Sequence, residues 1–278
     1  MIKNAYYNGA YMNIKDVAIP LSDRSVYFSD AVYDACLIRN KKIFMHEEHF
    51  ERLKRSATAI GLTPPDEKRL FNICERLISE CEGGFYFLYI QLSGYKEERS
   101  HSRIGASEGN LLITVTPISA PVPDATCKLI TVPDRRYSLC NIKTVNLLPA
   151  VLASSEAESR GADEAVFIRD GIVTECAHSN IHIIKNGVLF THPLDCHILG
   201  GITREHLLSI CKRLGIPYYE KAFGKEELFS ADEVLITSSS KLCRRVCEID
   251  GKEMPFLPRS HYASISSAML DDLYSATI

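Results

Sequence analysis

NIKTVNLL, residues 141–148, is the stretch around which this sequence is organised. Apolar and polar residues alternate around Lys143 and a helix-like segment follows, a pattern typical of a strand end that delivers one amine into a cleft. An amine held among apolar neighbours is partly uncharged and therefore nucleophilic, as Schiff-base chemistry requires. Residue type alone does not separate Lys143 from a solvated surface lysine, since the chain has 32 Lys and Arg residues.

A second polar stretch, VTECAHSN at residues 173–180, follows further along the chain. Within it, Glu175 offers a carboxylate that can pair with a protonated ring nitrogen. One lysine and one glutamate carry little weight alone, so their meaning depends on the rest of the sequence.

Four motifs follow one another along nearly the whole chain. They are DRSVYFSDAVYDACLIRNKKIFMHEEHFERL (23–53), the Lys143 stretch, LGGITREHLL (199–208) and EVLITSSS (233–240). Together they resemble the class IV aminotransferases, a family of branched-chain and D-amino-acid aminotransferases and aminodeoxychorismate lyase. The resemblance implies an α+β, two-domain fold of type IV, with pyridoxal 5'-phosphate (PLP) as cofactor in a cleft between the domains. D-amino-acid aminotransferases are the most similar branch.

Length and composition set wider bounds. The chain has 278 residues, of which 46% are hydrophobic and 24% charged, with a formal net charge of -3. This is the composition of a soluble globular protein with small-molecule substrates, and it gives no reason to expect nucleic acid or a membrane as partner. No apolar run approaches the roughly 20 residues that span a bilayer. The N-terminus lacks the apolar core of a signal peptide, so we expect a cytoplasmic location.

Ten cysteines are scattered along the chain without a C-x-x-C pair. In a cytoplasmic protein they are expected to be reduced, half-apolar residues, and no metal is expected. A zinc site from Cys243, Cys247 and a distant histidine is the alternative. Cys176, beside Glu175, is expected to be sensitive to oxidation if it is exposed.

Periodicity predicts mixed α and β elements around a proline-rich linker at residues 119–125. We therefore predict an N-terminal α+β domain over residues 1–118 and a C-terminal α+β domain over residues 126–278. Asp170-Gly171 and Asn186-Gly187 are two-residue turns that close hairpins. Helices are predicted at 46–60, from 66 onward, and at 147–160, 204–214 and 262–274, and strands at 85–94, 110–118, 127–133, 164–175, 180–192 and 233–240.

The resemblance assigns cofactor roles to several positions. Lys143 attaches PLP covalently, Glu175 pairs with its ring nitrogen, and Arg52 holds its phosphate; without the resemblance, Arg52 would more often be a surface ion pair. The glycine turn at 201–204 enters a helix with Thr203 as the predicted N-cap, so free N–H groups point at the anion. A plain capped helix explains this turn equally well. The remaining cofactor-binding residues are Ile202, Thr203, Ser238, Ser239, Ser179 and Asn180.

The substrate side rests on Arg99-Ser100-His101, in a polar loop after the strand that contains Tyr89. Residues two apart on an extended chain point to one side, so Arg99 and His101 form a fork and a second donor for a carboxylate. In D-amino-acid aminotransferases a similar Arg-x-His loop reaches across the dimer and, with a tyrosine (here Tyr33), binds the substrate carboxylate. The alternative is a solvated loop in which neighbouring glutamates neutralise Arg99.

The resemblance therefore implies transamination between a D-amino acid, of the D-alanine, D-glutamate or D-aspartate type, and a 2-oxo acid such as 2-oxoglutarate. Lys143 would act as the general base. A homodimer is implied, in which the loop around Arg99 and His101 completes the site of the other subunit. The alternatives are a branched-chain L-amino-acid aminotransferase or aminodeoxychorismate lyase on the same scaffold, and a PLP-binding protein without turnover.

Two departures from the family pattern affect the expected side-chain preference. His178 stands where small serines are usual, so it is expected to narrow the pocket or to add a proton donor. The segment from Lys241 to Arg245 is more basic than the pattern, so it either favours acidic substrate side chains or lies in solvent.

Overall fold

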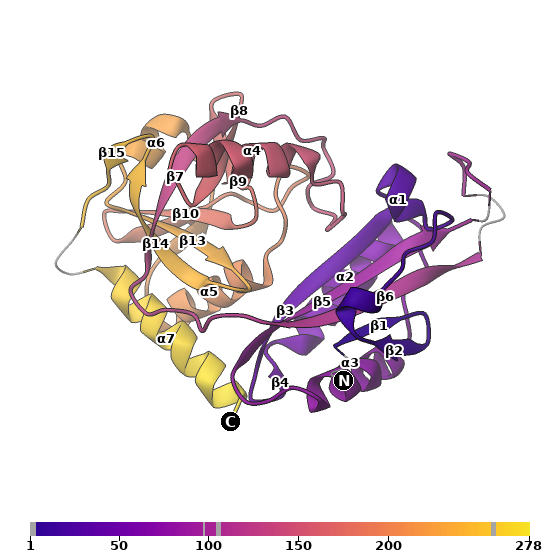
Figure 1. Cartoon of the computed structure of the whole chain (residues 1–278). Coiled ribbons are helices and arrows are strands. Elements are labelled where there is room, and N and C mark those ends of the chain that lie inside the picture. The colour runs from indigo at the N-terminus through magenta and orange to yellow at the C-terminus, as the bar shows by residue number, and fades with distance from the viewer. Residues whose placement is uncertain (1–3, 97, 104–106, 257–259) are drawn as a thin grey trace. The chain divides into compact units, whose positions relative to one another are not determined.

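The computed structural model describes residues 4–96, 98–103, 107–256 and 260–278 (Figure 1). It divides into two compact units. The first unit comprises Met1–Ala120, Ile142–Asn146 and Ser275–Ile278, and the second comprises Pro121–Asn141 and Leu147–Tyr274. The domain boundary at residues 119–125 stays a prediction, although the units part close to it. Lys143 belongs to the first unit although it follows the predicted linker in the sequence. A division of the chain at one point therefore cannot assign it correctly.

The first unit is built on a six-stranded antiparallel sheet in the order β2-β1-β6-β5-β3-β4. The register between its two central strands, β3 and β5, places Tyr33 opposite Gln91 and Ala35 opposite Tyr89. The strands are β1 Ala5–Tyr7, β2 Ala10–Met12, β3 Ala31–Arg39, β4 Lys42–Ile43, β5 Phe85–Tyr95 and β6 Ser107–Pro117. The helices are η1 Ile14–Asp16, α1 Arg24–Phe28, α2 His46–Ala59 and α3 Glu67–Ser79.

Two amphipathic helices cover this sheet. Phe50 and Leu53 of α2 and Leu70 and Leu77 of α3 lie in one core with the apolar residues of the strands. Helix α2 ends where Gly61 takes a positive φ of +71°, a conformation that glycine adopts without strain. The predicted helix over 46–60 is confirmed, and Asp66 caps the second predicted helix, its side chain accepting a hydrogen bond from the Arg69 amide.

The second unit is built on a nine-stranded mixed sheet in the order β12-β11-β10-β13-β14-β7-β8-β9, with β15 paired to β14. The predicted hairpin turns at Asp170-Gly171 and Asn186-Gly187 connect β8 to β9 and β10 to β11. The strands are β7 Thr126–Pro133, β8 Glu164–Arg169, β9 Ile172–Cys176, β10 Asn180–Lys185, β11 Val188–Thr191, β12 Tyr218–Glu220, β13 Glu233–Ser238, β14 Leu242–Ile249 and β15 Lys252–Glu253.

The helices of this unit complete three further cores. Leu207 and Ile210 of α5 pack with Ile265 and Met269 of α7, and Ala153 of α4 packs against strands β7 and β8. The helices are α4 Leu148–Ser159, α5 Ile202–Leu214, α6 Lys225–Phe229 and α7 His261–Ala276 (Figure 1).

The basic segment at 241–245 begins a strand that the sequence did not predict. Arg245 of β14 is buried, and its Nη2 lies 3.3 Å from the Glu233 carboxylate of β13. The negative charge of Glu233 neutralises the positive charge of Arg245 on the neighbouring strand. An interior strand can therefore contain the Arg-Arg sequence. The expectation that this segment either meets the substrate or lies in solvent is therefore wrong for Arg245.

The ten cysteines can be placed in the structure. All ten are free thiols, and Cys176 is buried, so the condition for its sensitivity to oxidation is not met. Within the described residues, the one cluster with metal-ligand geometry joins Asp34, Cys36 and His49, and it includes neither Cys243 nor Cys247. No helix of the described chain is long and apolar enough to cross a membrane.

His182 predicts a pH dependence of stability. This buried histidine shares hydrogen bonds of 2.9 Å with Thr191 and 3.0 Å with Thr237, and burial, together with the charge of Arg204, lowers its pKa from 6.5 to about 3. Between these values the unfolded chain binds a proton that the folded chain does not. The free energy of unfolding should therefore fall as the pH falls below about 6.5, by about 1.4 kcal/mol per pH unit from this residue.

Urea unfolding at several pH values between 7.5 and 5 checks this expectation. His182→Gln should have a shallower pH dependence than the wild type by this amount. Equal slopes for the wild type and His182→Gln would contradict the assignment.

Candidate functional site

The Lys143 segment is fixed by its backbone in the first unit. The carbonyl of Lys143 accepts a hydrogen bond from the Tyr33 amide (2.9 Å), and its own amide donates to the Ser56 hydroxyl (3.3 Å). An isolated bridge joins Thr144 to Val32 of β3. The segment is thus held against β3 on one side and α2 on the other. This agrees with the expected strand-like delivery of the amine, although Lys143 itself lies in a loop.

The Lys143 amine faces an aromatic pair. Its Nζ lies 4.3 Å from the centre of the Tyr33 ring, which stacks on the Tyr89 ring at a centroid distance of 5.4 Å. The Tyr89 hydroxyl donates to Gln91 (2.7 Å), and burial, with a contribution from Tyr33, raises the pKa of Tyr89. Three of the predicted site residues are therefore brought together on the face of β3 and β5.

Arg52 is buried rather than at the surface, which excludes its alternative interpretation as a surface ion pair. Its Nε and Nη2 each donate to the Asp34 carboxylate of β3 at 2.8 Å, and His49 Nδ1 lies 2.7 Å from the same carboxylate. Burial raises the pKa of Asp34, but the charge and hydrogen bonds of Arg52 outweigh it, with help from His49, and hold that pKa well below its usual range. Asp34 is thus an anion that fixes the Arg52 guanidinium.

Arg99 and His101 lie against helix α1. The Arg99 guanidinium lies 5.3 Å from the centre of the Tyr27 ring and 5.1 Å from that of Phe28, and the His101 ring lies 5.1 Å from the Phe28 ring. The solvated-loop alternative involved Glu97 and Glu98; Glu97 lies outside the described residues, and Glu98 is exposed. The described contacts of Arg99 and His101 are with α1, not with Tyr33 or Tyr89.

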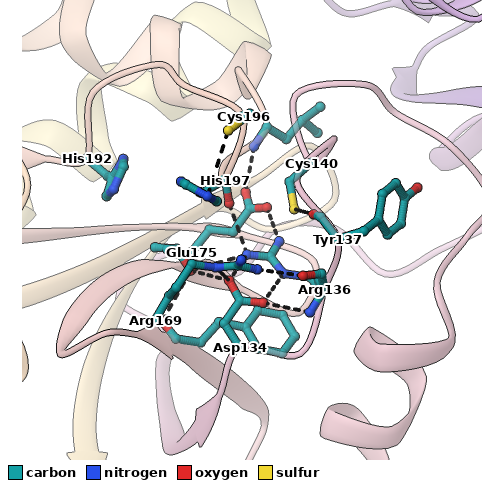
Figure 2. A network of polar contacts seen from close by, with 12 residues as sticks. Asp134, Arg136, Tyr137, Cys140, Arg169, Glu175, His192, Cys196 and His197 are labelled. Atoms are coloured by element: carbon teal, nitrogen blue, oxygen red, sulfur yellow. Dashed lines mark hydrogen bonds and ion pairs between the residues drawn. The ribbon is translucent and has the colours of Figure 1, made fainter.

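In the second unit, Glu175 is surrounded by hydrogen-bond donors (Figure 2). Arg136 Nη1 forms an ion pair with its Oε1, while the Leu199 amide (2.9 Å) and Asn180 Nδ2 (3.1 Å) donate to its Oε2. The carboxylate of this β9 residue is thus held by the segment after β7, by β10 and by the segment before α5. Donors of this kind stabilise the ionised form, which is the form that pairs with a protonated ring nitrogen.

Arg136 lies between two carboxylates, as Figure 2 shows. Its Nη2 is 2.9 Å from Asp134, whose side chain is fully buried, and its guanidinium lies 4.3 Å from the centre of the Phe167 ring. Burial lowers the pKa of Arg136, yet Asp134 and Glu175 together raise it; hydrogen bonds from Arg136 and Arg169, acting against burial, lower the pKa of Asp134 to about 2. Sequence reasoning missed this pair, whose only signal was DRR at 134–136, just before the Lys143 stretch.

Ser179 and Asn180 make their described hydrogen bonds to other protein groups. The Ser179 hydroxyl donates to the buried Glu164 (2.9 Å), and Asn180 Nδ2 donates to the Leu199 carbonyl (2.9 Å) as well as to Glu175. A side chain at Gly201 would place its Cβ 2.0 Å from Asn180 Oδ1, so glycine is required there. Whether Ser179 and Asn180 also contact the cofactor stays a prediction.

Helix α5 begins two residues earlier than predicted. Gly201 occupies the N-cap position and Ile202 the first helical position, so the prediction of Thr203 as N-cap is wrong. The Gly201 N-cap makes no side-chain cap hydrogen bond in this 13-residue helix, and a helix N-terminus of this kind suits an anion, so phosphate binding here stays a prediction. Ser238 ends β13, and Ser239 lies in the turn that follows. Among the described residues, Ser238 Oγ is a buried oxygen with no hydrogen-bond partner.

His178 lies at the turn between β9 and β10, and half of its side chain is exposed. Its amide (2.7 Å) and Nδ1 (3.1 Å) both contact the Glu164 carboxylate. Glu164 is fully buried and thus ties this turn to β8. Whether His178 also narrows a substrate pocket stays a prediction.

The site residues are divided between the two units. The first unit holds Lys143, Arg52, Tyr33 and Tyr89, and also Arg99 and His101 in a loop that contacts α1. The second unit holds Glu175, Ile202, Thr203, Ser238, Ser239, Ser179 and Asn180. Sequence reasoning also missed Asp34 and His49; the signal was a lone carboxylate in an apolar strand and an i, i+3 pair with Arg52 on one helix face.

Comparisons with known proteins identify the family of this chain. The family model for amino-transferase class IV matches residues 31–249. The D-alanine aminotransferase of Bacillus licheniformis is 36% identical over 252 residues, 88% of each sequence. A branched-chain aminotransferase from Thermoproteus uzoniensis, crystallised with norvaline, is 26% identical with a TM-score of 0.89, covering 96% of this chain and 93% of its own. A PLP-bound aminotransferase from Mycobacterium tuberculosis, at 22% identity, has a TM-score of 0.81 and 99% coverage of both chains, which shows the fold alone.

The predicted type IV fold is confirmed by these structures, and the sequence matches span most of the chain. The family model alone covers well over half of it. This chain therefore belongs to the class IV aminotransferases.

Proposed function

We propose that this enzyme is a D-amino-acid aminotransferase that moves the amino group between D-alanine, or a D-amino acid of the D-glutamate or D-aspartate type, and a 2-oxo acid such as 2-oxoglutarate. The observation that carries the proposal is the pairing of Arg99 and His101 on one ring, Phe28. A guanidinium and an imidazole presented together suit a carboxylate. The D-alanine aminotransferase of Bacillus licheniformis, 36% identical to this chain, supports the same substrate class.

Class IV aminotransferases depend on PLP, so PLP is the cofactor of this chain. The donor set fits this group. The first unit offers the Lys143 amine and the buried Arg52 guanidinium, and the second offers the Glu175 carboxylate and the amide end of α5. The Ser238 hydroxyl, buried and without a partner among the described residues, is the kind of group that a phosphate oxygen would satisfy.

When bound, PLP supplies a conjugated ring that accepts the negative charge developing at the substrate α-carbon. The chain supplies the proton transfers. We assign to Lys143 Nζ the removal of the α-proton, because its backbone is fixed on both sides and only its side chain has to move. Glu175, kept ionised by Arg136 and two further donors, holds the ring-nitrogen proton. Arg99, His101 and Tyr33 orient the carboxylate and so select the D-enantiomer.

Purified enzyme reconstituted with PLP tests the proposal. With D-alanine and 2-oxoglutarate we expect pyruvate and D-glutamate, and with L-alanine we expect at least about a hundredfold lower kcat/KM, since the wrong enantiomer cannot place both its carboxylate and its α-proton correctly. A preparation that carries PLP but leaves every D-amino acid unchanged would contradict the substrate assignment.

A branched-chain L-amino-acid aminotransferase is the second candidate, because the Thermoproteus uzoniensis enzyme has the same fold over nearly the whole chain. Turnover of L-leucine in preference to D-alanine would favour it. Aminodeoxychorismate lyase activity and PLP binding without turnover have no comparable observation in their support.

We further propose a cytoplasmic homodimer in which the loop with Arg99 and His101 completes the site of the other subunit. Helix α4 supports self-association, since it exposes Leu148 (69%), Val151 (55%) and Leu152 (62%) along one face. Apolar helix faces of this kind are covered in oligomers. Ten free thiols fit a reducing compartment. Analytical ultracentrifugation should find a dimer. A monomer that transaminates at the same rate as the dimer would contradict the proposal that one subunit completes the site of the other.

A further inference from the structure

The loop that carries Arg99 and His101 is held at residues 99–101 by one short helix, while Arg103 further along also pairs with Asp30 (3.3 Å) and donates to the Ile60 carbonyl. Arg24, the first residue of α1, donates Nη2 to the His101 carbonyl (2.9 Å) and Nη1 to the Ser100 carbonyl. Phe28, the last residue of the same helix, contacts both the Arg99 guanidinium and the His101 ring. The backbone and both side chains of the loop are therefore held by residues one helical turn apart on α1.

Helix α1 is itself fixed to the sheet of the first unit. Its N-cap, Asp23, is almost fully buried; the Ser25 amide donates to Oδ1 (2.9 Å), and Ser93 and Asn110 donate to Oδ2 at 2.7 and 2.8 Å. A five-residue helix has little stability alone, so these contacts with β5 and β6 keep it in place. Helix α1 is therefore a rigid support for the loop.

The charges around helix α1 leave Arg99 available to a ligand. The Arg24 guanidinium lies 4.6 Å from the centre of the Phe28 ring, and its Nε lies 2.7 Å from the carboxylate of Asp30. Asp30 therefore neutralises Arg24, and the described contacts of Arg99 are with two aromatic rings. An aromatic face orients a guanidinium without occupying its hydrogen-bonding edge, which remains free to bind a carboxylate.

From this arrangement we propose that Arg24 and Phe28 are positioning residues that preorganise Arg99 and His101 for the α-carboxylate of the substrates. The inference rests on the proposed function and deepens it, since it names the residues that set the geometry of carboxylate recognition. Both the amino acid and the 2-oxo acid carry this carboxylate, so both half-reactions depend on helix α1.

Phe28→Leu and Phe28→Tyr form the informative pair. Leucine keeps an apolar side chain but loses the aromatic face, and KM for D-alanine and for 2-oxoglutarate should rise about tenfold, with kcat changed less than about threefold. Phe28→Tyr keeps the ring and should stay close to the wild type. Arg24→Lys keeps a charge beside Asp30 but cannot donate to both carbonyls, and it should raise both KM values at least as much.

Hydrogen exchange of residues 98–103, followed by mass spectrometry, provides a readout without turnover. Exchange should be about tenfold faster in Phe28→Leu than in the wild type, because the loop loses its ring contacts. Val26→Ala, on the exposed side of the same helix, is the matched control and should change neither KM nor exchange. Unchanged PLP absorbance and melting temperature in the Phe28 variants show that the fold is intact.

The outcomes separate the two proposals. The inference is supported if Phe28→Leu has raised KM values for both substrates and faster hydrogen exchange, and if Phe28→Tyr has neither. Wild-type KM values in Phe28→Leu, or loop exchange at the wild-type rate, overturn it. A wild type that does not transaminate D-alanine overturns the proposed function instead, and the exchange experiment still decides whether α1 holds the loop.

Discussion

Lys143→Ala should lower the rate of D-alanine transamination by a factor of about 10³ or more, the upper part of the range for loss of a general acid or base. The enzyme would lose both the amine that attaches the cofactor and the base that removes the α-proton. Since the two roles belong to one atom, Nζ, no neighbouring side chain can replace half of the loss. This is the largest effect expected of any substitution in the chain.

The position of Lys143 explains why its loss should not unfold the protein. The contacts that fix the segment are made by backbone atoms, with the Tyr33 amide and the Ser56 hydroxyl as partners, and these remain when the side chain ends at Cβ. Among the contacts with described residues, the one that is lost is that of Nζ with the Tyr33 ring. We therefore expect a change in melting temperature of no more than a few degrees, as for a surface substitution.

Three measurements check this prediction. Single-turnover absorbance with D-alanine gives the rate, borohydride reduction followed by peptide mapping locates the attached PLP, and Lys41→Ala is the control, because the exposed Lys41 amine contacts only the Ser79 carbonyl among its described hydrogen bonds. Lys41→Ala should behave like the wild type. Reduction that labels another lysine, or a Lys143→Ala enzyme with a tenth of the wild-type rate, would remove the foundation of the proposed mechanism.

Features encoded by neighbouring residues could be predicted from the sequence. The helix over 46–60 follows from apolar residues at helical spacing before Gly61, and the hairpins follow from Asp-Gly and Asn-Gly. Lys143, Arg52 and Glu175 could be named because the motifs around them resemble a family. In each case the signal lies within one short stretch of chain.

Features that depend on a distant partner could not be predicted. Strand β14 was missed because two arginines argue against an interior strand until Glu233 is known to face Arg245. Arg136 and Glu175 are 39 positions apart, and Arg24 meets the His101 carbonyl across 77. Helix α1 is too short to show a helical period. The support of the loop with Arg99 and His101 therefore had no sequence signal.

Asp34→Asn is expected to lower the free energy of unfolding of the apoenzyme by about 3–5 kcal/mol, the usual cost of removing one partner of a buried ion pair. Asp34 is fully buried and Arg52 nearly so, and two hydrogen bonds of 2.8 Å join them. An asparagine keeps the shape of the side chain but leaves the guanidinium charge without its anion. His49 also loses a charged partner at 2.7 Å.

A double-mutant cycle with Arg52→Met separates the ion pair from general damage. If the penalty comes from an uncompensated charge, the double variant should be less destabilised than the sum of the two single variants by about 2 kcal/mol. Asp16→Asn, on the exposed η1 of the same unit, should change stability by less than about 0.5 kcal/mol. Additive effects in the cycle would show that the pair does not act as a unit.

The pH dependence gives the same prediction a second test, with a definite sign. Since Arg52 and His49 hold the pKa of Asp34 well below its usual range, the folded protein keeps this carboxylate ionised in mild acid. The stability that it contributes is complete above the pKa of the unfolded chain, about 3.9, and is lost only as the pH falls through and below that value. The difference between the wild type and Asp34→Asn should therefore stay constant from pH 8 to pH 5. A difference that shrinks within this interval would mean that Asp34 is not the anion that fixes Arg52.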